Sequence, residues 1–211
     1  MIRIERIVVG NWKENTFLLI KNNKLWIIDP GDEFVEIDRV ICNLNLTPIG
    51  IINTHGHFDH IGAVAELQEK YDIPFYIHAS DKQLVRQANL YRKIAGENGI
   101  IKTPKIDYYL NKLSEIELDG IKIYIFHTPG HTKGSLTFMI QEHVFIGDLF
   151  FNNELARTDL PGGNVEQLKQ SIKFVLANFK NMNIHTGHGV SFELNNKSIE
   201  NMEKLVYGLS N

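Results

Sequence analysis

The chain has 211 residues, 43% of them hydrophobic and 22% charged, with a formal net charge of −3 at pH 7. Such values are typical of a soluble globular protein with a buried core, and without a basic run they give no reason to expect a nucleic-acid partner. Cys42 is the only cysteine, which excludes an intramolecular disulfide and a cysteine-rich metal site. No apolar run approaches the roughly 20 residues that cross a bilayer, and the first residues contain no stretch apolar enough for a signal peptide. We therefore expect a cytoplasmic protein without a membrane partner.

Strands and helices alternate in the first part of the chain. Residues 15–20 and 24–29 predict a hairpin that turns at residues 21–23. A helix follows, whose buried face has three- and four-residue spacing: Phe34, Ile37, Ile41 and Leu44. Cys42 falls within this segment and is expected to be a small buried side chain. The apolar run 49–54 is typical of a strand covered on both faces.

The alternation continues to the end of the chain. We expect a short helix from Ile61 to about Tyr71, a strand at 75–78, and a helix capped by Ser80 that carries Leu84, Val85, Ala88, Tyr91 and Ala95. The irregular stretch 96–114 is either a substrate-facing loop or a plain surface connection. Three strands at 121–128, 135–140 and 143–147 precede a helix capped by Asn164, a strand at 183–186 and a last helix from about Lys197. Since no linker divides the chain, we expect one domain over residues 1–211.

The segment NTHGHFDHIG, residues 53–62, places three histidines and an aspartate within six positions. They are His55, His57, Asp59 and His60. A hydrophobic core has no use for such a cluster, whereas neutral imidazole and carboxylate are ligands that zinc and ferrous iron accept. The cluster begins where the predicted strand 49–54 ends, and ligand sites in open α/β sheets tend to lie outside the carboxyl ends of strands. The segment therefore predicts a metal site.

Three later residues fit the same site. His131, Asp148 and His188 each stand at a predicted strand-to-loop junction next to glycine. Glycine permits unusual backbone dihedrals and a close approach of backbone and metal. Together with the cluster these residues make seven candidate ligands, enough for two cations that share one bridging carboxylate.

The order of these motifs, THGHFDH, HTPGHT, GD and GHG, resembles that of the metallo-β-lactamase superfamily, and the early IIDPG extends the resemblance over nearly the whole chain. The resemblance implies an α/β fold, a four-layer αββα sandwich with two central mixed sheets flanked by helices. It also implies two metal sites, one held by His55, His57 and His131 and one by Asp59, His60 and His188, with Asp148 as the bridge.

The chemistry that the resemblance implies is hydrolysis. A bridged pair of divalent cations, with zinc expected and iron or manganese as alternatives, lowers the pKa of a shared water and supplies a hydroxide nucleophile. Asp59 is expected to orient this hydroxide, so that its loss harms turnover more than the loss of one imidazole. Asp29 is a candidate partner for the free N–H of a ligating histidine. The remaining histidines, His78, His127, His143 and His185, are expected to have structural or surface roles. For His127 and His185 an indirect role beside a ligand stays open, because each precedes a candidate ligand by three or four positions.

The stretch GDLFFNNELARTDLPGGN, residues 147–164, is similar to a segment of small glyoxalase II-like hydrolases. Arg157, Thr158 and Asp159 match its GRTD element, while Ala156 replaces the glycine and Thr186 replaces a proline that usually precedes the last motif. The resemblance thus favours a thioesterase acting on S-acyl glutathione or a related small-molecule thioester, as a monomer or small homo-oligomer. Arg157 either binds a substrate carboxylate or forms an internal salt bridge.

Other functions fit less well. A persulfide dioxygenase with a single iron is the main alternative, because the three ligands it needs are present: His57, His131 and Asp148. Flavodiiron-type proteins usually carry Glu at the position of His57, nucleic-acid-processing members have a basic surface, and a true β-lactamase is expected to carry a signal peptide. A non-catalytic metal module is disfavoured because a structural zinc site closes with four ligands.

Overall fold

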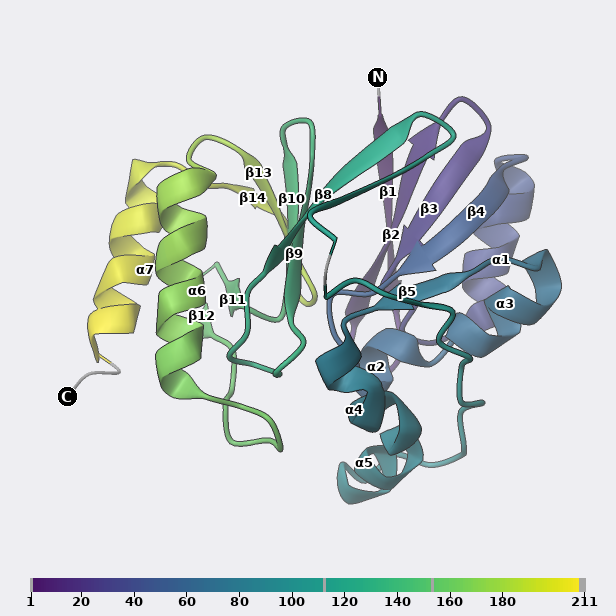
Figure 1. The fold of residues 1–211 in the computed structure, drawn as a ribbon, viewed down its shortest axis with the longest axis horizontal. Coiled ribbons are helices and arrows are strands. Elements are labelled where there is room, and N and C mark those ends of the chain that lie inside the picture. Colours follow the sequence, from purple (N-terminus) through teal and green to yellow (C-terminus); the bar gives the residue numbers. More distant parts are fainter. Residues whose placement is uncertain (1, 112, 153, 209–211) are drawn as a thin grey trace.

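Two mixed β-sheets lie face to face in the computed structural model, which describes residues 2–111, 113–152 and 154–208, and helices cover their outer faces (Figure 1). The first sheet has the strand order β1-β2-β3-β4-β5-β6 and the second the order β14-β13-β10-β9-β8-β7. Each sheet contains both parallel and antiparallel neighbours. The predicted four-layer αββα sandwich is therefore confirmed.

The strands are short and follow the expected order along the chain. The first sheet contains β1 (Arg3–Val9), β2 (Glu14–Lys21), β3 (Lys24–Ile28), β4 (Thr47–Ile52), β5 (Phe75–Ile77) and β6 (Tyr108–Tyr109). The second contains β7 (Glu115–Leu118), β8 (Ile121–His127), β9 (Leu136–Ile140), β10 (His143–Gly147), β13 (Asn183–Thr186) and β14 (Phe192–Glu193). A small ribbon joins β11 (Phe150–Phe151) to β12 (Glu154–Leu155).

The helices form the two outer layers and one end of the molecule. They are α1 (Phe34–Asn43), α2 (Phe58–Ile61), α3 (Val64–Tyr71), α4 (Lys82–Arg86), α5 (Ala88–Ile94), α6 (Val165–Asn178) and α7 (Asn196–Gly208). In Figure 1, α1 and α3 lie outside the first sheet and α6 and α7 outside the second, while α2, α4 and α5 gather at the lower end. No helix in the described part of the chain is long and apolar enough to cross a membrane.

Successive side chains of the central strands point to opposite faces of each sheet, and the apolar ones form three buried layers. On β2, Leu18 and Ile20 pack in the cluster under α1 and α3, whereas Phe17 and Leu19 pack between the sheets. On β10, Phe145 faces the space between the sheets, and its neighbours Val144 and Ile146 pack under α6 and α7. Because side chains of a strand point alternately to its two faces, a continuous apolar run is what a strand covered on both faces requires.

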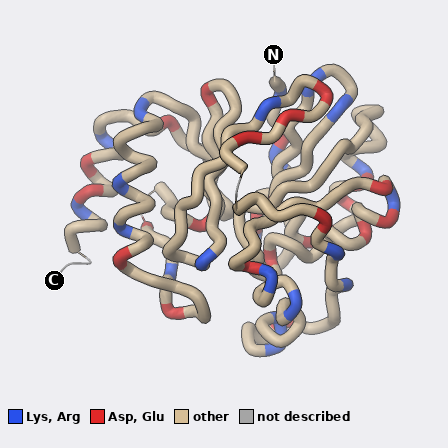
Figure 2. The backbone as a smooth tube through the Cα atoms, viewed as in Figure 1, with Lys and Arg blue, Asp and Glu red and all other residues tan. Residues whose placement is uncertain are grey.

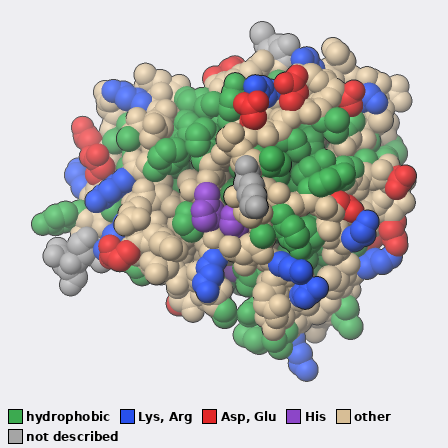
Figure 3. Space-filling model, in the orientation of Figure 1, with side chains coloured by type: hydrophobic (Ala, Val, Ile, Leu, Met, Phe, Trp, Pro, Cys, Tyr) green, Lys and Arg blue, Asp and Glu red, His purple; other side chains and the backbone are tan. Residues whose placement is uncertain are grey.

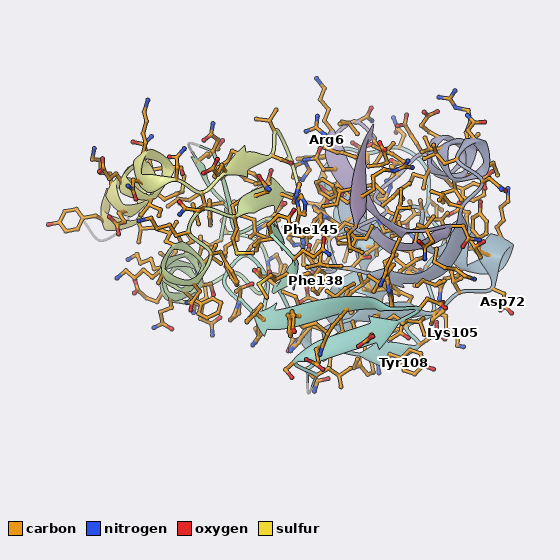
Figure 4. The ribbon with its side chains drawn as sticks, turned by 90° about the horizontal axis from the view of Figure 1, so that it is seen from above. Arg6, Asp72, Lys105, Tyr108, Phe138 and Phe145 are labelled. Carbon is orange, nitrogen blue, oxygen red and sulfur yellow. The ribbon has the colours of Figure 1, made fainter. Side chains whose placement is uncertain are left out.

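The layer between the sheets is built on aromatic side chains. Phe17 meets Phe145 edge-on with ring centroids 5.1 Å apart, and Trp26 meets Tyr76 in the same way at 5.3 Å. Figure 4 shows Phe138 and Phe145 near the middle of the molecule, between the two halves. The Phe17–Phe145 contact joins β2 of one sheet to β10 of the other and so helps to set their separation, whereas Trp26 and Tyr76 both belong to the first sheet.

Several predicted elements are confirmed and others are wrong. The hairpin β2–β3 turns through Asn22, whose φ of 56° is tolerated by asparagine. Cys42, however, is exposed, because one helical step rotates it about 100° away from the buried Ile41. The helix expected from Ile61 begins later, because Ile61 ends α2 and α3 starts at Val64; between them the Ala63 N–H donates to the Pro30 carbonyl at 3.0 Å.

Two further differences concern the segment after β5. Ser80 does not cap a helix; it lies in a 3₁₀ turn in which its N–H donates to His78 Nδ1, and the expected single helix is divided at Gln87 into α4 and α5. The stretch 96–114 contains the edge strand β6, and its residues Lys105 and Tyr108 line, together with Asp72, a hollow whose described lining contains no histidine. These three residues lie near one another in Figure 4. Residue 112 lies outside the described residues.

We predict that the inter-sheet aromatic layer carries much of the stability. Replacing Phe145 by Ala leaves a cavity in a site that is 1% exposed, so the free energy of unfolding should fall by about 3–5 kcal/mol. Phe174→Ala is the control, because this side chain is 36% exposed on α6 and should cost less. Urea unfolding of the metal-free protein measures both, and equal losses would contradict the prediction.

Candidate metal centre

The seven predicted ligands converge at one end of the two sheets. The loop and helix after β4 carry His55, His57, Asp59 and His60, and the loops after β8, β10 and β13 carry His131, Asp148 and His188. Each group therefore follows the carboxyl end of a strand, the usual place for a ligand site in sheets of this kind. The sequence places these residues up to 133 positions apart, and only the packing of the sheets brings them together.

Backbone contacts lock these loops to one another. The Leu136 N–H donates to the Thr54 carbonyl at 2.8 Å, which ties the histidine loop to the second sheet. At the next loop, Gly187 donates to Gly147 at 2.9 Å and accepts from Asn15 at 2.8 Å. A Cβ at Gly187 would collide with the carboxylate of Asp148 and the ring of His60, so the position requires glycine. Steric contact with candidate ligands thus explains Gly187, whereas Gly147 packs against Thr54 and Gly130 against Leu168.

The first group of candidate ligands is His55, His57 and His131. One ring nitrogen of each lies within 4.8 Å of the others, and His131 Nε2 lies 2.9 Å from His57 Nδ1. All three side chains are buried. Three imidazole nitrogens directed at one point are a donor set suited to zinc or iron.

The second group is Asp59, His60 and His188, whose donor atoms also lie within 4.8 Å of one another. His188 Nε2 is 3.4 Å from Asp59 Oδ2, and His60 Nε2 is 4.0 Å from the same oxygen. A third grouping of Asp29 with His55 and His60 meets the same distance limit. Both oxygens of Asp29 already accept hydrogen bonds, so this carboxylate is an orienting group rather than a donor to a metal.

Asp148 lies between the two groups. Its Oδ2 is 3.7 Å from His131 Nε2 in the first group and 3.5 Å from His188 Nε2 in the second. Its Oδ1 is 3.5 Å from His60 Nε2. A single carboxylate that faces both histidine groups is the arrangement that a bridging ligand needs.

Hydrogen bonds fix the rotation of the histidine rings. His60 Nδ1 donates to Asp29 at 3.1 Å, His131 Nδ1 to the Arg157 carbonyl at 2.8 Å, and His188 Nδ1 to the Trp12 carbonyl at 2.9 Å. Donation from Nδ1 leaves Nε2 with its lone pair directed into the centre. Metal-binding histidines usually donate their other N–H to a carboxylate or carbonyl in this way.

The donor atoms that face the centre fit a cation. Among the described residues, the buried atoms His55 Nε2, His60 Nε2 and Asp148 Oδ1 have no hydrogen-bond partner. Buried polar groups are normally paired, and three unpaired acceptors within one cluster call for a positively charged partner. The residues present therefore fit a bound divalent metal.

The protonation states of the cluster agree with this interpretation. Burial, followed by the neighbouring His131, lowers the pKa of His57 to about 3, and burial lowers the pKa of His55 as well. Burial alone would raise the pKa of Asp59, but the hydrogen bond from His188 and the nearby histidines lower it overall. Near neutral pH, His55 and His57 are thus neutral with free lone pairs, and Asp59 is ionised.

Acidic residues around the cluster extend the hydrogen-bond network. Asp29 accepts from the Thr54 N–H at 2.7 Å and the Thr54 hydroxyl at 2.5 Å, in addition to His60. The Thr54 hydroxyl in turn lies 3.1 Å from His55 Nδ1. The predicted partnership of Asp29 with a ligand histidine is observed, and it reaches one histidine in each group.

Two buried carboxylates near the centre were not predicted from the sequence. Asp81 accepts from Gly56 N–H at 3.0 Å, Thr132 Oγ1 at 2.7 Å and Gly134 N–H at 2.8 Å, so it joins the loops that carry His55 and His131. Glu14 lies 3.7 Å from His60 Nδ1, and its burial raises its pKa although His60 opposes the shift. Their roles depend on contacts over long sequence separations, which no local pattern signals.

The 147–164 segment forms one side of the site. Arg157 Nε and Nη2 each donate to Asp159 at 2.7 Å, so the guanidinium forms the internal salt bridge that was one of its two predicted roles. Thr186, in place of the expected proline, donates to the His188 carbonyl at 2.6 Å. Ala156 is buried in the core under α6, where its methyl group is accommodated. Neither departure from the family pattern disturbs a ligand.

The remaining histidines do not contact the centre. His78 and His127 stack with ring centroids 4.4 Å apart, and His143 Nδ1 lies 3.0 Å from His185 Nε2, whose other nitrogen meets Ser191. Histidine side chains reach the surface near the middle of the face in Figure 3, between hydrophobic side chains. Lys and Arg are interspersed with Asp and Glu over most of the described backbone, whereas α4 and α5 carry Lys82, Arg86, Arg92 and Lys93 without an acidic residue between them (Figure 2).

A cavity of about 700 Å³ opens onto the centre. His57, Asp59, His131, Asp148 and His188 lie on its surface. The size is ordinary for a small-molecule site, and the candidate ligands are thus accessible to a substrate.

Residues 9–188 match the family model described as the metallo-beta-lactamase superfamily. The chain belongs to this superfamily. The matched range contains all seven candidate ligands, and the superfamily's divalent-metal chemistry fits the His/Asp clusters.

Several superfamily members are similar over most of their length. The "Probable metallo-hydrolase YqgX" of Bacillus subtilis is 36% identical over 87% of this chain and 89% of its own. The "Hydroxyacylglutathione hydrolase GloC" of Haemophilus influenzae is 33% identical over 89% and 91%. Among solved structures, BLEG-1 B3 metallo-beta-lactamase has a TM-score of 0.85 and 30% identity over 91% of this chain and 94% of its own. TTHA1623 in a di-iron-bound form has a TM-score of 0.82 and 33% identity over 90% and 94%.

We predict that Asp29 raises metal affinity through His60 and Thr54. Asp29→Ala should weaken metal binding about 10–100-fold, since removing such a partner frees the ring orientation of the ligand. Competition against a chelator measures the affinity, with Asp29→Asn as a milder variant. Asp38→Ala, which removes a carboxylate bonded to Lys70 and Tyr71, is the matched control. Unchanged affinity in both Asp29 variants would contradict the role.

We predict that His185 destabilises the metal-free protein in acid. Burial, followed by the charges of His143 and Arg6, lowers the pKa of His185 to about 3, against about 6.5 when unfolded. Between these two pKa values His185 binds a proton in the unfolded chain but not in the folded chain. The free energy of unfolding therefore decreases as pH falls below about 6.5. His185→Gln should lose less stability than wild type between pH 7 and pH 4.5 in urea unfolding. Parallel losses would show that another group is responsible.

Proposed function

We propose that this protein is a binuclear metal-dependent hydrolase of S-acyl thioesters. The observation that carries the proposal is Asp148, whose carboxylate faces His131 on one side and His60 and His188 on the other. We propose His55, His57 and His131 for one cation and Asp59, His60 and His188 for the other, with Asp148 between them. Zinc is the metal we propose, with iron or manganese as alternatives at the same ligands.

Each residue of the centre has a role in this proposal. When bound, a pair of cations supplies a hydroxide nucleophile at neutral pH and polarises the substrate carbonyl. The oxygen of water becomes bonded to the acyl carbon, and the C–S bond breaks with its electron pair on sulfur. One proton of the water completes the thiol, the other is released to solvent, and the acyl group leaves as a carboxylate. Asp59, which is ionised and hydrogen-bonded to His188, accepts a hydrogen bond from the attacking water and so orients it.

Two nitrogen donors that a single iron would leave unused favour the hydrolase over the mononuclear iron dioxygenase. His57, His131 and Asp148 would suffice for one iron, and they do lie together. That reaction gives no role to His55 Nε2 and His60 Nε2, which are buried without a hydrogen-bond partner. In the two-metal centre proposed here, His55 joins His57 and His131 at one cation, and His60 joins Asp59 and His188 at the other. The relative named hydroxyacylglutathione hydrolase supports thioester cleavage, and the di-iron form of TTHA1623 supports a two-metal centre without deciding the metal.

The other properties that the sequence predicts stay part of the proposal. We propose one domain over residues 1–211, a cytoplasmic location, and action as a monomer or small homo-oligomer on a small molecule. Neither a nucleic acid nor a membrane is part of the proposed activity.

The deciding experiment combines metal analysis with two assays. Elemental analysis of protein purified without added metal or chelator should give about two equivalents per chain. The same preparation should release thiol from S-acyl thioesters and consume no oxygen with glutathione persulfide. One equivalent of iron together with persulfide-dependent oxygen uptake would overturn the proposal in favour of the dioxygenase.

We predict that Asp148→Ala lowers the metal content of both sites and reduces thioester hydrolysis by at least about 100-fold. Loss of the shared carboxylate removes a donor from each cation and leaves both histidine groups without their bridge. Glu154→Ala is the matched control, because Glu154 lines the same cavity without facing the histidine groups. Full activity of Asp148→Ala at normal metal content would contradict the binuclear arrangement.

We predict that Asp59→Asn harms turnover more than His55→Gln does. The amide keeps the shape of the side chain but loses the negative charge that orients water, so kcat should fall by about 10²–10⁴-fold. Metal content of each variant is measured in parallel. If kcat follows metal content alone in both variants, Asp59 acts only as a ligand.

A further inference from the structure

One wall of the cavity is apolar and comes mostly from segments that carry no candidate ligand. Trp12, Phe58, Leu84, Tyr91 and Ile94 line it from the β1–β2 turn, α2, α4 and α5. These helices gather at the end of the molecule where the candidate ligands converge (Figure 1). The opposite side, from the β11–β12 ribbon and the loop after it, adds Leu155 and Leu160. A substrate in this cavity thus meets the metal centre on one side and apolar side chains on two others.

Contacts hold this wall in one arrangement. The Trp12 indole N–H donates to Glu97 at 2.9 Å, and its ring meets Phe58 edge-on with centroids 5.9 Å apart. The guanidinium of Arg92, itself buried, lies 5.8 Å from the centre of the Phe58 ring. A wall that is ordered before binding loses little conformational freedom when an apolar group packs against it.

The cavity offers little for a charged substrate group. Beyond the candidate metal ligands, the charged side chains in its described lining are Glu154 and Arg157. Arg157 already forms two hydrogen bonds with Asp159. Glutathione has two carboxylates, and a site built to recognise it would direct free cationic groups at them. The described lining has no such pair.

The apolar surface continues outward from the cavity. Ile94 is 71% exposed although it lines the cavity, and Leu90, one helical turn earlier on α5, is 52% exposed. Exposed apolar side chains that continue the wall of a cavity mark a ligand surface more often than isolated ones do.

We infer that the wall of Trp12, Phe58, Leu84, Tyr91 and Ile94 binds the acyl group of the substrate, and that this group is a medium-length aliphatic or aromatic one rather than a small hydroxyacyl group. The inference rests on the proposed thioester hydrolysis and names its substrate class. The thiol carrier then lies toward solvent and contributes little recognition. Preference therefore depends on the acyl group.

The test is a series of thioesters of one thiol, N-acetylcysteamine, with acetyl, lactoyl, butyryl, hexanoyl, octanoyl and phenylacetyl groups. Each methylene that is fully buried should raise kcat/KM about fourfold, so octanoyl should exceed acetyl by at least about tenfold, chiefly through KM. Octanoyl-glutathione should be no better than octanoyl-N-acetylcysteamine. A flat series, or a clear preference for lactoyl-glutathione, would overturn the inference and leave the proposed hydrolase standing.

Two matched variants locate the effect. Ile94→Ser should lower the octanoyl-to-acetyl ratio of kcat/KM by about threefold or more. Ile100→Ser is the control, because Ile100 is 85% exposed outside the cavity lining and should leave the ratio unchanged. Equal ratios in wild type and Ile94→Ser would contradict the placement of the acyl group.

A binding measurement separates the two proposals. Trp26 is fully buried between the sheets, so Trp12 is the tryptophan that a cavity ligand can reach. Octanoate, but not acetate at the same concentration, should change the tryptophan fluorescence of wild type and not of Trp12→Phe. If octanoate gives this signal but no thioester is cleaved, the hydrolase proposal fails while the apolar acyl site stands. If neither ligand gives a signal and the thioester series is flat, the acyl site fails.

Discussion

The geometry of the centre depends on the buried carboxylate of Asp29. One oxygen accepts from the Thr54 N–H, and the other accepts from the Thr54 hydroxyl and from His60 Nδ1. Through Thr54 the same carboxylate reaches His55, so a single side chain orients one histidine in each candidate metal group. Asp29 has a φ of 49°, a left-handed conformation that aspartate tolerates better than most residues. The turn after β3 thus combines an unusual backbone with a fixed charge.

The charges of the centre explain why it favours cations. Glu14, Asp29, Asp59 and Asp148 surround His60, which is fully buried. Burial would lower the pKa of His60, but Asp148 and Asp29 raise it overall, which shows that these carboxylates favour a positive charge at this point. A divalent metal supplies the same compensation with more charge, and bound cations reverse the local electrostatics of such sites.

The seven candidate ligands and most central strands and helices were predicted because they leave local signals, whereas the four-layer arrangement followed from the family resemblance. Apolar runs such as 49–54 follow from strands with two covered faces, and the histidine spacing follows from one loop after β4. The edge strands were missed, since β1 and β7 have few buried side chains and β6 and β14 have two residues each. Asp81 was missed for a different reason: its partners Gly56 and Gly134 lie 25 and 53 positions away. Cys42 was wrongly predicted to be buried, because the spacing of apolar residues locates the buried face of a helix only to within one residue.

The division of the site between rigid and peripheral segments has a functional consequence. The candidate ligands stand on loops that the two sheets hold through backbone hydrogen bonds, and glycines at 147 and 187 leave no room for change there. Part of the apolar wall comes instead from the short helices α4 and α5, which lie outside both sheets, whereas Phe58 stands on α2 beside Asp59 and the Trp12 carbonyl accepts from His188. A substitution such as one at Ile94 alters the wall without touching a ligand or its hydrogen-bond partner. Substrate preference can therefore change while the chemistry of the centre stays the same, which is the general pattern of function carried on a shared fold.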